Sequence, residues 1–222
     1  MSSIIDLLTR LFEENQNAEN AAQMEGYMKN HFPFFGIKSP QRREIEKQFF
    51  QETGILKEPF SQELVLELWK MDQREYQNVA LTYIEKSLKK LQKSDLSLMQ
   101  TLITTKSWWD TVDALAAKPV GKIAQKYPEV VEETIDGWAA HDNMWLRRTA
   151  ILFQLKYKQE TNEEKLYDYI MLNADSKEFF IQKAIGWVLR EYSKTNPQSV
   201  KSFIGVHRLA PLSVREGSKY LA

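Results

Sequence analysis

Apolar residues recur along most of the chain at spacings of three and four, with polar residues between them. This spacing gathers the apolar side chains on one face of an α-helix, whereas a half-buried strand would alternate at every second residue. Eight glycines and seven prolines in 222 residues are too few for the many turns of an all-β sandwich. The pattern therefore predicts an all-α protein that is helical nearly throughout.

Residues that favour helix starts stand at regular intervals. Ser39 before Pro40 is typical of an N-cap followed by a proline in the first turn. Further starts are predicted at Asp72 with Glu75, Ser107 with Asp110, Asp142, and Asp175 with Glu178, at intervals of 35, 35 and 33 residues. An alanine in each of these helices repeats the interval, at Ala80, Ala114, Ala150 and Ala184.

An internal period near 35 residues, built of helix pairs, is typical of an α-solenoid. The Trp, Leu-Gly and Tyr pattern of tetratricopeptide repeats is absent from the sequence, so we expect HEAT-like repeats that form a single domain over residues 1–222. The alternative is an irregular helix bundle in which the spacing arises by chance.

Charged residues are sorted between the predicted helices, although the formal net charge is zero. The first helices of the pairs, at 61–72, 128–140 and 162–172, are net acidic, and the second helices, at 73–93, 106–126, 142–158 and 176–194, are net basic. Second helices line one side of a solenoid, usually the concave side. We therefore expect a concave basic face that can meet nucleic acid. Alternatively, the charges only keep the helices soluble.

The remaining composition excludes several chemistries. The sequence has no cysteine for a thiolate nucleophile or a zinc ligand, and its three histidines are too scattered for a metal triad, so we expect neither a metal nor a cofactor. The apolar runs are far shorter than the ~20 residues of a membrane span, and no signal peptide is recognisable at the start. We expect a cytoplasmic protein without a membrane partner.

A helical projection of the second helices, at about 100° per residue, gathers one set of side chains on one side. The set comprises Trp109, Asp113, Trp187, Lys86, Lys90, Lys93, Lys156, Lys183 and Arg190. Each part has a structural alternative, since a tryptophan is usually core and an aspartate among lysines is usually half of an ion pair. Together they predict a functional face, because a carboxylate among phosphate-binding cations is most useful where positive charge develops.

One known protein family is similar to this sequence over most of its length. The segments that carry the similarity are KSWWDTVDALAAKPVG (106–121), DNMWLRRTAILFQLKYKQ (142–159), SKEFFIQKAIGWVLREYSKTNP (176–197), YMKNHF (27–32), REYQNVAL (74–81) and LAPLS (209–213). They resemble the DNA alkylation repair family of HEAT-like DNA glycosylases of the bacterial AlkD type. The resemblance implies a solenoid that wraps double-stranded DNA and, as a monomer, excises positively charged N3- and N7-alkylated purines such as 3-methyladenine and 7-methylguanine.

The same resemblance assigns expected roles to single residues. It places Trp109, Asp113 and Trp187 in the catalytic cleft and Arg148 beside them on the DNA backbone. Further DNA-binding or cleft-lining positions are expected at Tyr27, Phe179, Phe180, Lys156, Lys183 and Arg190, the last three from the basic set defined above.

The expected reaction needs few catalytic groups. An N3- or N7-alkylated purine is already cationic and departs as a neutral base without a general acid, which leaves an oxocarbenium-like deoxyribose for Asp113 to stabilise. We expect a monofunctional enzyme that positions water and leaves an abasic site. Most glycosylases flip the base into a pocket, but the resemblance implies a family that recognises the lesion by its charge and backbone without enclosing the base. The alternatives are a non-catalytic HEAT-like scaffold for DNA structures or proteins, and a module that stacks unpaired bases on Trp109 and Trp187.

Overall fold

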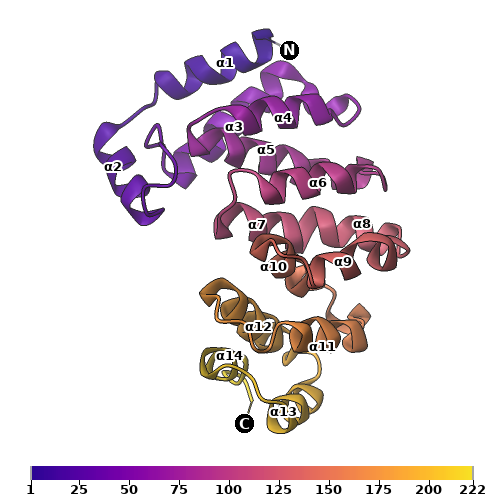
Figure 1. Ribbon diagram of the computed structural model, residues 1–222. Helices are drawn as coiled ribbons and strands as arrows, with labels where there is room; N and C mark the ends of the chain where they lie inside the picture. The colour runs from indigo at the N-terminus through magenta and orange to yellow at the C-terminus, as the bar shows by residue number, and fades with distance from the viewer. Residues whose placement is uncertain (1, 222) are drawn as a thin grey trace. The chain divides into compact units, whose positions relative to one another are not determined.

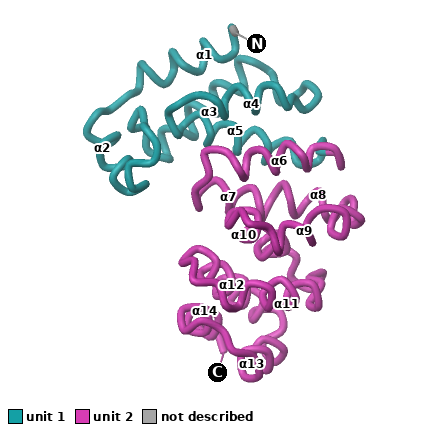
Figure 2. The backbone as a smooth tube through the Cα atoms, viewed as in Figure 1, with its two compact units in different colours: residues 1–91 teal, residues 92–222 magenta. Residues whose placement is uncertain are grey.

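The computed structural model describes residues 2–221. Helices make up 71% of the chain, and the described residues contain no strand, so the all-α prediction is confirmed. The chain divides into two compact units, Met1–Leu91 and Gln92–Ala222 (Figure 2). No described helix has both the length and the hydropathy that a membrane span requires.

The first unit contains five α-helices (Figure 1). They are α1 (Ser2–Glu13), α2 (Ala18–Tyr27), α3 (Ser39–Thr53), α4 (Gln62–Lys70) and α5 (Arg74–Lys86), with short 3₁₀ turns at Ile55–Lys57 and Leu88–Lys90. Helix α3 packs against α1 and α5, and α4 packs against α5. The core between them includes Phe12, Phe49 and Leu68, each without exposed surface.

A buried carboxylate holds the loop between α2 and α3. Glu75 accepts hydrogen bonds from the backbone N–H groups of Phe35, Gly36 and Ile37 at 3.1, 3.0 and 3.1 Å. Gly36 adopts φ +84°, and a Cβ atom there would lie 2.0 Å from the carbonyl oxygen of Asn17. Glu75 therefore stabilises a loop, and the capping box predicted with Asp72 is wrong.

The second unit contains the remaining α-helices (Figure 1). They are α6 (Asp95–Thr104), α7 (Trp109–Leu115), α8 (Gly121–Lys126), α9 (Asp136–Ala139), α10 (Met144–Leu152), α11 (Glu163–Leu172), α12 (Phe179–Tyr192), α13 (Pro197–Val206) and α14 (Pro211–Gly217). Two π-helical segments, Ala116–Val120 and Val131–Ile135, lead into α8 and α9, and Lys158–Glu160 forms a 3₁₀ turn. Helix α10 is central, since it contacts α6, α7, α9, α11 and α12.

Four helices begin 35 residues apart, α5 at Arg74, α7 at Trp109, α10 at Met144 and α12 at Phe179. Their N-cap residues are Gln73, Trp108, Asn143 and Glu178, one to three residues after the predicted caps. Among these four only Asn143 caps with its side chain, which accepts from the N–H groups of Trp145 and Leu146. Ser107 instead donates to the Ile103 carbonyl oxygen of the preceding helix at 2.6 Å. The spacing alone does not identify the repeat type, so the HEAT-like solenoid, its concave basic face and the single domain stay predictions.

Candidate functional site

A cleft of about 330 Å³ in the second unit collects most of the residues that the sequence analysis selected. Its walls come from α7, α10, α12 and α14. Helices α7 and α12 both pack on α10, and α14 packs on α12 (Figure 1). The lining residues are Trp109, Asp113, Arg148, Phe179, Phe180, Lys183, Trp187, Arg190 and Glu216.

Local helix geometry explains why α7 and α12 present these side chains together. On α12, Lys183, Trp187 and Arg190 are four and three residues apart, so they share one face of the helix. The opposite face is apolar and buries Ile181 and Ile185. Trp109 and Asp113 are likewise one turn apart on α7. The helical projection made from the sequence is therefore valid within these two helices.

A paired carboxylate and guanidinium lie inside the cleft. The Nε and Nη2 atoms of Arg148 donate to Oδ1 and Oδ2 of Asp113 at 2.7 and 2.9 Å, and Nη1 donates to the carbonyl oxygen of Phe180. All three nitrogens of Arg148 thus contact protein acceptors, and only 4% of the residue is exposed. Asp113 retains 16% exposure of its side chain, and it lines the cleft.

The pKa of the Asp113 carboxyl lies above its ordinary value, because the effect of burial is larger than the opposing effect of Arg148. Burial raises the pKa of the Asp113 carboxyl, while the hydrogen bonds and positive charge of Arg148 lower it. The nearby Asp110 carboxylate raises the pKa further. Arg148 is therefore the group that favours the ionised form of Asp113 in a poorly solvated position.

Aromatic rings support Arg148 and extend to the cleft entrance. Trp108, Trp145 and Phe180 form a cluster with ring centroids 5.8, 5.1 and 5.1 Å apart. The Phe180 ring lies 5.8 Å from the guanidinium carbon of Arg148. Its neighbour Phe179 is 58% exposed, so it presents a large apolar surface beside the cleft.

The cleft contains a second carboxylate that no pattern in the sequence indicated. Glu216 of α14 accepts from Lys219 and Arg190 at 2.7 and 2.9 Å and lies 3.4 Å from Lys183. The hydrogen bond from Lys219, with the charge of Lys183, lowers the pKa of Glu216 to about 2. Gly186 and Gly217 are the sequence signal for the close approach of α12 and α14, but the sequence does not show that these glycines face each other's helices.

Two predicted DNA-binding residues lie outside the lining of this cleft. Tyr27 belongs to the first unit, at the end of α2, and is 69% exposed. Lys156 is exposed and follows the end of α10 at Leu152. Their roles in DNA binding stay predictions, as do those of the lining residues.

The helical projection is wrong for residues placed beyond the ends of the helices. Helix α5 ends at Lys86. Lys90 donates to the carbonyl oxygens of Leu56 and Glu58, and Lys93 pairs with Glu129 and Glu133 at 3.2 and 2.7 Å. These lysines therefore do not share one helical face with Lys86, because the intervening backbone leaves the α-helix.

The described residues contain no group of three His, Asp or Glu side chains arranged to hold a metal ion. The cleft instead combines aromatic surfaces, cations and two carboxylates. Such a site can bind an anionic chain along its cations while Asp113 faces a developing positive charge.

Comparisons with known proteins agree with the resemblance seen in the sequence. A family model for a DNA alkylation repair enzyme matches residues 8–221. A solved structure from Enterococcus faecalis, described as a predicted DNA alkylation repair enzyme, is 36% identical with a TM-score of 0.86, covering 93% of this chain and 97% of that one. The smu.31 protein of Streptococcus mutans UA159 shares the fold, with 19% identity, a TM-score of 0.60, and coverage of 82% and 98%. No curated protein matches significantly.

The family match spans nearly the whole chain, and the Enterococcus faecalis structure is similar in both sequence and fold. The family predicted from the quoted segments is thus confirmed, together with a role in DNA repair. The chain belongs to the DNA alkylation repair enzyme family.

Proposed function

We propose that this protein is a monofunctional DNA glycosylase that hydrolyses the N-glycosidic bond of N3- and N7-alkylated purines in duplex DNA. The observation that carries the proposal is the cleft, in which Asp113 lies with two indoles, Trp109 and Trp187, among cationic side chains. A protein that only binds DNA gains nothing from a carboxylate facing phosphates. The proposal includes a monomeric, cytoplasmic protein built of HEAT-like repeats.

The reaction begins with a base that is already activated. The bond between C1′ and the purine nitrogen breaks, and its electron pair stays with the cationic purine, which leaves as a neutral base. The deoxyribose becomes oxocarbenium-like, and water attacks C1′, loses a proton to solvent and leaves an abasic site. No general acid is required, which fits the two cleft carboxylates, since neither is positioned as a free proton donor.

Asp113 supplies the negative charge that this intermediate needs. A carboxylate about 4 Å from a unit charge contributes up to about 4 kcal/mol at an effective dielectric constant near 20, or roughly a thousandfold in rate. Arg148 holds the carboxylate in one orientation and favours its ionised form, although its own positive charge offsets part of the attraction. The stabilisation of the intermediate that remains is modest, and it is sufficient only for an N-glycosidic bond that alkylation has already weakened.

The indoles and cations position the substrate around this carboxylate. Trp109 and Trp187 contact the sugar edge of the lesioned nucleotide, and Lys183 with Arg190 binds phosphates of the same strand. Phe179, Tyr27 and Lys156 provide further contacts with DNA. The lesion is recognised by its charge and backbone, and the base stays outside a pocket.

The direct test is incubation of the purified protein with duplex DNA that contains N7-methylguanine. We expect release of the free methylated base and a strand that remains intact until it is treated with alkali. Undamaged duplex is the control. Absence of base release at saturating protein contradicts the glycosylase, and an enzymatic strand nick contradicts a monofunctional one.

One observation favours a non-catalytic binder of DNA structure. Both carboxylate oxygens of Asp113 accept hydrogen bonds from Arg148, as in an ordinary structural ion pair. If this reading is correct, the protein binds duplex or distorted DNA in a salt-dependent manner and releases no base. The same incubation therefore separates the two candidates.

A further inference from the structure

The two carboxylates of the cleft differ in the number of cations that they hold. Asp113 has one partner, Arg148. Glu216 has three, with Lys219 Nζ at 2.7 Å, Arg190 Nη1 at 2.9 Å and Lys183 Nζ at 3.4 Å. Three positive charges around one negative charge leave the cluster cationic, so it attracts an anion, whereas the Asp113 pair is balanced.

Glu216 is also unsuited to the role proposed for Asp113. Its side chain is 9% exposed, and its oxygens are occupied by the surrounding cations. With a pKa near 2 it stays ionised at neutral pH and has no proton to give. Its remaining use is to hold the cations, two of which line the cleft.

The backbone holds Glu216 in place against α12. A Cβ atom at Gly186 would lie 2.5 Å from the Cβ atom of Glu216, so the helices meet where α12 has no side chain. Ser213 of α14 also donates to the Gln182 carbonyl oxygen of α12 at 2.9 Å. Because the fixed carboxylate already holds the long cationic side chains in place, these side chains lose less conformational entropy when they bind an anion.

We propose that Glu216 is a positioning residue that holds Lys183, Arg190 and Lys219 together as a preformed site for one backbone phosphate of the DNA strand in the cleft. The proposal rests on the proposed function and adds to it a phosphate contact organised by a carboxylate. The cluster has two positive charges in excess of the Glu216 carboxylate, so it can bind one phosphodiester, with its single negative charge, and remain cationic. The phosphate shares the cations with Glu216 without displacing it.

The number of phosphates is tested through the salt dependence of binding to undamaged duplex. Each of Lys183→Ala and Lys219→Ala is expected to lower the slope of log affinity against log salt, by no more than about one. The double variant is also expected to lower it by no more than about one, because both lysines serve the same phosphate. Unchanged slopes, or a double variant that loses about two contacts, overturn the proposal.

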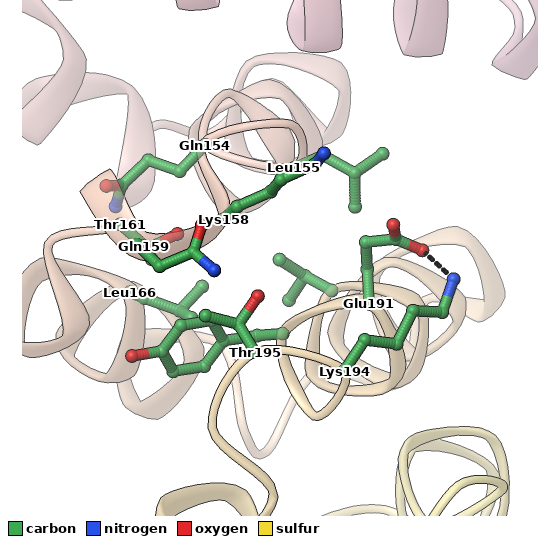
Figure 3. Close-up of a pocket in the computed structure, with 11 residues that line it drawn as sticks. Gln154, Leu155, Lys158, Gln159, Thr161, Leu166, Glu191, Lys194 and Thr195 are labelled. Atoms are coloured by element: carbon green, nitrogen blue, oxygen red, sulfur yellow. Dashed lines mark hydrogen bonds and ion pairs between the residues drawn. The ribbon is translucent and has the colours of Figure 1, made fainter.

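Positioning by Glu216 is tested with a charge-matched pair of variants. Glu216→Gln is compared with Glu191→Gln, which removes one carboxylate from the same helix pair at a different pocket, where Glu191 pairs with Lys194 at 2.6 Å (Figure 3). In single-turnover excision from saturated complexes, we expect Glu216→Gln to be slower by about tenfold or more, because small misplacements near a reacting bond are costly. Glu191→Gln should keep the wild-type rate.

The readouts separate positioning from simple stability. Loss of folded protein lowers the amplitude of the reaction, whereas loss of positioning lowers the rate in the folded, DNA-bound fraction. A wild-type rate for Glu216→Gln, or equal slowing in both variants, contradicts the proposal. If the wild-type protein releases no base, the proposed glycosylase fails, but the salt slopes of the lysine variants still decide whether the phosphate site exists.

Discussion

At the scale of single residues, one neighbour favours the ionised form of Asp113. Burial and Asp110 both raise the pKa of the carboxyl, and Arg148 alone among the groups that shift it lowers it. A buried carboxylate that loses its cation takes up a proton more readily. The activity proposed for Asp113 therefore requires Arg148, whether or not the guanidinium also touches DNA.

Replacing Arg148 with alanine tests this dependence. Because only groups that raise the pKa of Asp113 remain, we expect the acid limb of the excision rate to move to higher pH, measured by single turnovers across the acid and neutral range. We also expect about 3 kcal/mol lower stability at neutral pH, measured by urea unfolding, since a buried charge loses its partner. An unmoved acid limb with weaker binding to every duplex would support the backbone-binding role implied by the resemblance instead.

Asp113→Asn removes the charge while it keeps nearly the same shape. We expect duplex affinity to be kept or raised, because a repulsive carboxylate is lost, and excision to fall by up to about a thousandfold, the limit set before the charge of Arg148 is counted. Single-turnover rates on N7-methylguanine duplex measure this. The control is Asp110→Asn, on the same helix but outside the cleft lining, which should stay near the wild-type rate. Equal activity of Asp113→Asn and wild type would remove Asp113 from the mechanism.

At the scale of helices, glycines determine how closely α12 and α14 approach. Gly186 lies in the interior of α12, where glycine weakens a helix by roughly 0.5–1 kcal/mol relative to alanine. Its position is explained by α14, whose Glu216 and Ser213 backbone or Cβ atoms occupy the space that a side chain would need. Packing of this helix pair therefore overrides local helix propensity.

Two glycine variants separate these effects. Gly186→Ala should destabilise the protein by about 1–3 kcal/mol, because its Cβ atom would lie 2.5 Å from the Cβ atom of Glu216 and 3.1 Å from the Ser213 carbonyl oxygen. Gly137→Ala, in a helix with no atom within 4 Å of the added Cβ, should stabilise it by roughly 0.5–1 kcal/mol. Urea unfolding of both variants measures the difference. Changes of the same sign would mean that the α12–α14 contact is looser than described.

At the scale of the whole molecule, the formal net charge is zero, but acidic and basic residues are concentrated in different segments of the chain. Binding to an anionic polymer depends on the cations at the contact surface, and distant carboxylates matter little beyond a Debye length of about 8 Å at physiological ionic strength. A neutral chain in a DNA repair family is therefore consistent with electrostatic binding to DNA. Its affinity should fall steeply as salt is added.

Recognition by charge also predicts which lesions the protein accepts. If the protein recognises the charge of the base and contacts only the sugar and phosphates, a larger alkyl group at N3 or N7 meets no pocket wall. Enlarging this group should then change the single-turnover excision rate by less than about tenfold. The measurement compares N7-methylguanine with a bulky N7 adduct in the same duplex. Strict discrimination by adduct size would indicate an enclosing base pocket and contradict the proposed mode of recognition.

The sequence by itself determined the properties that depend on near neighbours along the chain. Helical periodicity placed Lys183, Trp187 and Arg190 on one face of α12 and Asp113 one turn from Trp109, because a helix fixes the directions of side chains three and four residues apart. Helical periodicity failed beyond the end of a helix, at Lys90 and Lys93. The residue at which a helix ends is set by local competition among backbone and side-chain hydrogen-bond partners.

Only the tertiary structure decided which groups meet across helices. It brought Arg148 onto Asp113, 35 residues earlier in the chain, and Glu216 onto Arg190, 26 residues earlier. The first contact needs α7 to pack on α10, and the second needs α14 to pack on α12. This packing leaves Asp113 with one cation and Glu216 with three. Because such packing joins distant segments, no local pattern of residues encodes it.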